Sequence, residues 1–142
     1  MKKLIITIIL IITSLLQTVS AEMVVVINEK NSIESLSKSE VIDIYMGRHT
    51  KFSNGVSAMP VDQQKNSSLQ QIFYKQLIGK SLAKVNAYWA RLTFTGRAKP
   101  PKTINDSANI ELFVQTNIGA IGYMDNKDID TRLKVVFRFE DF

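Results

Sequence analysis

The apolar residues along the chain change repeatedly between the spacing of strands and the spacing of helices. Residues 23–27, Met-Val-Val-Val-Ile, form a continuous apolar and β-branched run. Such a run predicts a strand buried on both faces, of the kind found in parallel sheets. Four segments with helical spacing and three more strand-like segments follow it. The helices are expected to begin at Ser37, Ser67, Ser81 and Asp106 or Ser107, and the strands to cover 58–62, 120–124 and 133–139.

Local signals indicate where several of these elements begin and end. Ser37 and Glu40 form a capping box, and Gly47 is expected to end the helix that they start. Pro60 restricts its segment to a sheet edge or to the start of a strand, because proline has no backbone N–H to donate. The second helix is expected to bury one apolar face, which consists of Leu69, Ile72, Phe73 and Leu77.

The order of the elements is β-α-β-α-α-α-β-β. Strands that alternate with helices predict an α/β domain with a mixed, mostly parallel sheet that is flanked by helices. No proline-rich, glycine-rich or low-complexity stretch divides residues 22–142, so this region is expected to form one domain.

Residues 1–21 have the pattern of a secretory signal peptide. Lys2 and Lys3 precede an apolar run over 4–16, and small residues lead to a cleavage site after Ala21. The run is short for a membrane span, which needs about 20 apolar residues, although an uncleaved N-terminal anchor is the alternative. The chain has no cysteine, and an exported chain without cysteine is typical of the bacterial periplasm. We therefore expect a periplasmic protein that begins at Glu22.

The composition removes several classes of chemistry. Without cysteine the chain has no disulfide, no thiolate metal site and no cysteine nucleophile, and its single histidine, His49, cannot form a multi-histidine site. Asp125, Asp128 and Asp130 are spaced like the start of a calcium loop, but the chain has Asp130 where that loop needs glycine. No nucleophile elbow or phosphate-binding glycine motif is present. We therefore expect no enzymatic activity, no cofactor and no metal.

The charge also limits the choice of partner. The chain has 18 lysine and arginine residues against 13 aspartate and glutamate residues, a net charge of +5. The basic residues are scattered and form no long run, so nucleic acid is not an expected partner.

The most informative segment is 60–69, which reads as a strand, a polar loop and the start of a helix. A helix N-terminus offers unpaired N–H groups and a partial positive charge, and both favour an anion. Hydroxyls of Ser67 and Ser68 and amides of Gln63 and Asn66 could add donors. The alternative is structural, because Ser67 and Gln70 also match a capping box that satisfies only the helix itself.

Two arginines flank the loop after the third helix. Arg97 follows Gly96, which permits a close backbone approach, so Arg97 could bind an anion or could simply be exposed to solvent. Arg91 is expected to be an exposed residue whose aliphatic part packs against Trp89, and Trp89 is expected to be a core residue.

Several segments, in the right order, resemble the phosphate-binding protein of phosphate ABC transporters, and together they cover most of residues 22–142. They are 24–28 (Val-Val-Val-Ile-Asn), 36–47 (ending in Asp-Ile-Tyr-Met-Gly), 59–62 (Met-Pro-Val-Asp), 67–73, 88–97 (Tyr-Trp-Ala-Arg followed by Thr-Gly-Arg) and 119–123 (Gly-Ala-Ile-Gly-Tyr).

This resemblance implies a periplasmic α/β fold of the type II binding-protein class, in which two lobes close over an anion. The chain resembles the second lobe, and the family's first anion loop has no counterpart in it. The family's second anion motif is an arginine, a loop, and then Ser-Gly-Thr at a helix start. Ser67 matches the serine, Ser68 stands at the glycine, Leu69 at the threonine and Gln63 at the arginine.

Two functions follow as expectations. The first is an exported solute-binding protein for phosphate or a related oxyanion, with a ligand site at Gln63, Asn66, Ser67, Ser68 and Arg97. A membrane permease would be its partner, and a second protein or a homodimer would complete the pocket. The second is a ligand-free module that docks on a membrane receptor such as a sensor kinase. An exposed apolar patch near Leu69 and the strand ends would mark that docking surface.

Overall fold

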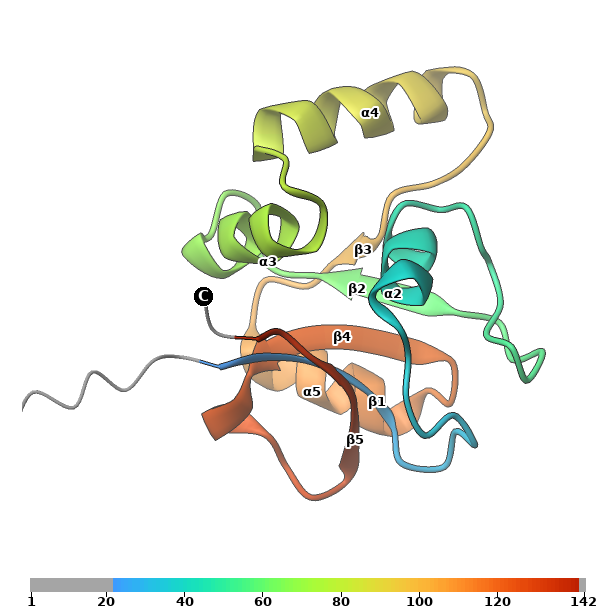
Figure 1. Ribbon diagram of the computed structural model, residues 1–142, viewed down its shortest axis with the longest axis vertical. Coiled ribbons are helices and arrows are strands. Elements are labelled where there is room, and N and C mark those ends of the chain that lie inside the picture. The colour runs from blue at the N-terminus through green and yellow to red at the C-terminus, as the bar shows by residue number, and fades with distance from the viewer. Residues whose placement is uncertain (1–21, 141–142) are drawn as a thin grey trace, which may run out of the picture.

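The computed structural model describes residues 22–140 (Figure 1). The expected signal peptide, 1–21, lies outside the described residues. None of the described helices combines the length and the apolar character that crossing a bilayer requires.

Five strands form one sheet, in the order β3-β2-β4-β1-β5. β2 is parallel to both β3 and β4, whereas β1 is antiparallel to β4 and to β5. Four of the five strands therefore run in one direction, and β1 alone runs against them. The mixed α/β architecture is confirmed. The strands are β1 (Met23–Asn28), β2 (Met59–Asp62), β3 (Lys102–Thr103), β4 (Ala120–Asp125) and β5 (Leu133–Arg138).

The expectation that the first strand is a parallel strand was wrong, although its burial was predicted correctly. Every residue of β1 is buried. Val25 and Ile27 contribute to a core beneath α2 (Lys38–Tyr45) and α3 (Ser68–Ile78), while Val24 and Val26 contribute to a second core beneath α5 (Ser107–Thr116). A central strand covered on both faces needs a continuous apolar sequence whichever way its neighbours run.

The helix starts follow their predicted caps. Ser37 and Glu40 form the complete capping box of α2, and Gly47 follows this helix with a φ of 70°. Asp106 caps α5 by accepting the N–H of Ala108, which decides between the two predicted cap residues.

The buried face of α3 differs from the prediction at one residue. Phe73 and Leu77 are buried and Leu69 is half-buried, but Ile72 is 47% exposed. Gln70 is buried instead, because its amide binds a carboxylate inside the molecule. The polar contact therefore overrides the apolar periodicity.

The segment between Phe94 and Ser107, which joins the last two helices of the chain, contains a strand that the sequence pattern did not indicate. β3 pairs only with Val61 and Asp62, so β2 has a single neighbour at Pro60. Pro60 thus lies at a local sheet edge, as its missing N–H requires. The remaining helix of this region, α4 (Leu82–Phe94), lies outside the layer that α2 and α3 form (Figure 1).

α4 contacts the rest of the molecule over a small area. Val85 and Trp89 are its only buried residues. Trp89 lies against the end of α2, where a Cβ on Gly47 would come within 2.8 Å of the indole ring. The expectation that Trp89 is a core residue is confirmed. Arg91 is exposed as expected, and its guanidinium lies over the ring of Tyr88, 5.9 Å from its centre.

The close approach of two backbones at the start of β4 gives a first prediction. A Cβ added at Gly119 would overlap the carbonyl oxygen of Ser57, which is backbone and cannot turn aside. We expect Gly119→Ala to destabilise the fold by about 1–3 kcal/mol, as overpacked sites do, and to lower the Tm by several degrees. Gly122→Ala is the matched control, because its Cβ would meet only side-chain methyl groups at 3.1 Å or more. Equal Tm values for both variants would contradict this account.

Candidate functional site

The candidate site lies where β2 ends and α3 begins. The chain leaves β2 at Asp62, turns through 63–66 and enters α3 at its N-cap, Ser67. Asn66 has a φ of 62° and is the only described residue other than glycine with a positive φ. Asparagine tolerates this conformation better than most residues, which allows the tight turn into the helix.

Ser67 caps its own helix, as the structural alternative predicted. Its Oγ accepts the N–H of Gln70 at 3.2 Å. The capping box is incomplete, because the Gln70 side chain accepts from the N–H of Asn66 at 2.8 Å and donates to Asp62 at 3.0 Å. The Ser67 hydroxyl accepts in this arrangement and keeps its own proton free to donate.

The first turn of α3 leaves two backbone donors without an acceptor. Among the described residues, the N–H groups of Ser68 and Leu69 form no hydrogen bond, whereas the N–H of Gln70 is held by Ser67. Ser68 and Asn66 are exposed, and so is Lys65 in the preceding loop. This end of α3 therefore presents free donors and a nearby positive charge to solvent.

Gln63 does not face this cluster of donors. Its side chain is buried and donates to the backbone carbonyl of Tyr123 at 2.8 Å. Gln63 and Leu69 also border a cavity of about 260 Å³ that is lined by three carboxylates, those of Glu111, Asp125 and Asp128. The negative charge there opposes an anion.

Arg97 lies at the far end of α4. It is exposed, and its backbone N–H donates to the carbonyl of Leu92 where the helix ends, after Gly96 has turned the chain with a φ of 66°. The cavities that Gln63 and Lys65 border do not include Arg97. Three of the predicted site residues therefore lie together at the start of α3: Asn66, Ser67 and Ser68. The side chain of Gln63 points into the sheet instead, and Arg97 lies at the far end of α4.

Sequence reasoning missed the carboxylate at the centre of this region. Asp62 is buried and accepts four hydrogen bonds. Among the described residues no lysine, arginine or histidine forms an ion pair with it. The donors are the backbone N–H of Gln63, the side-chain amide of Gln70 and the hydroxyls of Tyr74 and Tyr123.

The tyrosines around Asp62 form one aromatic cluster. Phe73 stacks on Tyr123 with ring centres 3.6 Å apart, and Tyr45 meets Phe73 edge to face at 4.8 Å. Burial, together with the Asp62 carboxylate, raises the pKa of Tyr74 and of Tyr123 well above the ordinary value. The pKa of Tyr45 is raised in the same way. These hydroxyls therefore remain protonated donors.

With this geometry in view, the fold can be compared with known proteins. An ABC-type phosphate transport receptor from Vibrio cholerae has a TM-score of 0.64 at 17% identity, over 81% of this chain and 45% of that one. A phosphate ABC transporter substrate-binding protein from Clostridium perfringens, solved with bound phosphate, has a TM-score of 0.64 at 19% identity, over 81% and 44%. PstS from Borrelia burgdorferi has a TM-score of 0.60 at 10% identity, over 81% and 46%.

The chain has the fold of phosphate ABC transporter substrate-binding proteins. It spans less than half the length of each of these proteins, which is consistent with a single lobe. No family model matches the sequence, and no curated protein matches it. The comparison therefore identifies the fold alone. What the site can bind has to be argued from the residues of this chain.

The Asp62 cluster gives a second prediction, on stability. Asp62→Asn replaces one carboxylate oxygen by an NH₂ group, which is a donor and cannot accept. The donors of Gln70, Tyr74 and Tyr123 then compete for the one oxygen that remains. We expect a loss of about 2–4 kcal/mol, because buried donors lose their acceptors. Urea unfolding measures this loss. Asp106→Asn is the matched control, because asparagine caps a helix as well as aspartate does. A similar loss in both variants would show that the buried cluster is not the cause.

A third prediction concerns alkaline pH. An unfolded tyrosine ionises at about pH 10, whereas the folded state keeps Tyr45, Tyr74 and Tyr123 protonated. Their contribution to stability is therefore complete below about pH 10 and is lost as the pH rises further. In a Tyr88→Phe variant, the only tyrosines are these three. We expect tyrosinate absorbance to rise together with the loss of circular dichroism. Absorbance that rises in a chain that is still folded would contradict the expectation.

Proposed function

We propose that this chain is an exported, non-enzymatic solute-binding protein that binds phosphate or a related oxyanion at the start of α3. The observation that carries the proposal is the pair of unpaired backbone donors at Ser68 and Leu69, beside the Ser67 hydroxyl. Hydrogen-bond donors at a helix N-terminus complement an anion in both charge and geometry. The structural neighbours are proteins of phosphate transport, which supports phosphate as the first ligand to test.

The polar residues around these donors determine where the anion would lie. Lys65 and Asn66 are exposed on the loop that leads into α3 and can contact the same anion. The acidic cavity that Gln63 and Leu69 border repels an anion, so we place the ligand away from that cavity, against 65–68 and the backbone N–H of Leu69.

This site predicts weak binding by the chain alone. Gln63 is turned into the sheet and Arg97 lies at the far end of α4, so neither supplies a fixed cation at the helix start. Phosphate bound at one exposed helix end stays largely hydrated. We propose that a second protein or a second copy of the chain encloses the anion, and that a membrane permease is the partner.

Export rests on the sequence of residues 1–21. Two lysines, an apolar run and a terminal Ala21 form the pattern of a cleavable signal peptide. We propose that the protein acts in the periplasm from Glu22 onward.

The alternative of a ligand-free docking module gains no support at the surface where it was expected. Leu69 is half-buried and packs against the larger core. The large exposed apolar residues of the described chain come from separate elements, and Ile72 alone lies on α3 with Leu69. They are Met59, Ile72, Phe94, Leu112 and Ile118.

A fourth prediction tests the donors themselves. Proline is well tolerated at the first position of a helix, which Ser68 occupies, and Ser67 has the extended conformation (φ −64°, ψ 153°) that a following proline requires. Ser68→Pro therefore deletes one N–H donor and keeps the helix. We expect millimolar phosphate to raise the Tm of the wild-type chain and of Ser68→Ala, and to raise that of Ser68→Pro much less.

Sulfate at matched ionic strength is the control for a general salt effect. Lys65→Gln should also weaken the phosphate shift, because it removes the exposed positive charge of the loop that leads into α3. An equal shift with sulfate, or a full phosphate shift in Ser68→Pro, would overturn the proposed site.

A further inference from the structure

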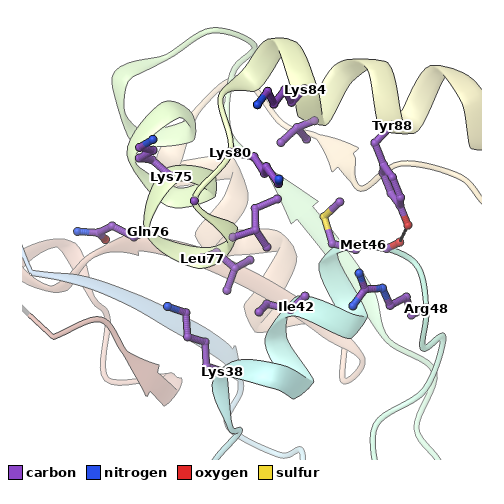
Figure 2. Close-up of a pocket in the computed structure, with 13 residues that line it drawn as sticks. Lys38, Ile42, Met46, Arg48, Lys75, Gln76, Leu77, Lys80, Lys84 and Tyr88 are labelled. Atoms are coloured by element: carbon purple, nitrogen blue, oxygen red, sulfur yellow. Dashed lines mark hydrogen bonds between the residues drawn. The ribbon is translucent and has the colours of Figure 1, made fainter.

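A groove of about 1020 Å³ lies between α2, the end of α3 and the start of α4. Its lining residues include none of Gln63, Asn66, Ser67 and Ser68, so this groove is separate from the proposed anion site. Figure 2 shows its two sides, with Lys38 and Ile42 on α2 and Lys75 and Leu77 on α3.

The floor of the groove is apolar. Ile42, Met46, Leu77 and Val85 line it from three different helices, and Figure 2 shows Leu77, Ile42 and Met46 lying between the charged side chains. The hydroxyl of Tyr88 donates to the carbonyl of Met46 at 2.7 Å and closes one end. Such a floor favours an occupant that has apolar side chains along one face.

The rim of the groove is strongly basic. Within residues 22–140, no aspartate or glutamate lines it. Among the described residues, only one of its cations has an anionic partner: Arg48, at 3.2 Å from Asp43. The four lysines are exposed and form no ion pair within the described chain. The five cations are Lys38, Arg48, Lys75, Lys80 and Lys84.

A glutamine is also among the residues of the groove. Gln76 lines it, and its Oε1 is buried without a donor among the described residues. This oxygen is buried, so it is not a contact for an occupant of the groove.

We propose that the groove binds an acidic amphipathic helix of a partner protein. The apolar face of that helix would lie on Ile42, Leu77 and Val85, and its glutamate or aspartate residues would pair with the lysines on both sides. A concave groove between helices suits a helix, whereas a bilayer would require a convex or flat apolar surface. This inference does not depend on phosphate binding at α3.

The experiment uses the chain from residue 22 onward, which contains both hydrophobic cores and every described element. The probe is a fluorescein-labelled synthetic helix of about 18 residues, or five turns, with leucines along one face and glutamates on both sides of them. Binding is measured by fluorescence anisotropy. We expect saturable binding that weakens as salt is added.

Charge reversal in the groove has a matched control elsewhere. The triple variant Lys38→Glu, Lys80→Glu and Lys84→Glu should weaken binding about tenfold or more. A second triple variant carries the same change at three exposed lysines outside the groove and should bind like the wild type. Those lysines are Lys30, Lys51 and Lys99.

Three results would overturn the proposal. The first is equal weakening in both triple variants, which would indicate a general charge effect. The second is equal binding of a peptide with lysine in place of every glutamate. The third is tighter binding to phosphatidylglycerol vesicles than to the peptide, which would assign the basic face to a membrane. Ile42→Ala should weaken peptide binding without changing the phosphate response, so the two proposals can fail independently.

Discussion

The packing of α3 against β2 and β4 depends on the hydrogen bonds that the buried carboxylate of Asp62 accepts. Asp62 ends β2, and its hydrogen bonds reach Tyr123 in β4 and both Gln70 and Tyr74 in α3. One side chain thus joins two neighbouring strands to the helix that covers them. A buried charge without a counter-ion is tolerated only when its lone pairs are filled, and here four donors fill them.

The same carboxylate shapes what the start of α3 can bind. Gln70 would complete a capping box if its Oε1 accepted the backbone N–H of Ser67, but this oxygen accepts the N–H of Asn66 while its Nε2 donates to Asp62. Gln63 is likewise held against the backbone of Tyr123. Two side chains that could have contacted a ligand are therefore committed to the interior, and recognition is left to the backbone of Ser68 and Leu69.

Local sequence signals predicted the elements well and their long-range relations less well. Ser37 and Ser67 were identified as caps because a capping bond joins residues only three apart. The direction of β1 depends on pairing with strands about a hundred residues away, which its own apolar run cannot reveal. The burial of Gln70 in place of Ile72 has the same origin, because it depends on Asp62 and the Tyr123 beside it.

The small contact area of α4 has a consequence for motion. Val85 and Trp89 alone are buried along this helix, the Trp89 Nε1 has no acceptor among the described residues, and Phe94 is 92% exposed. Helices with so few buried contacts open at a lower free energy than the sheet beneath them. Hydrogen exchange should therefore be faster along α4 than along β1. Since α4 forms one wall of the basic groove, that wall is the part of the groove that opens most easily. An occupant that packs against α4 would slow its hydrogen exchange.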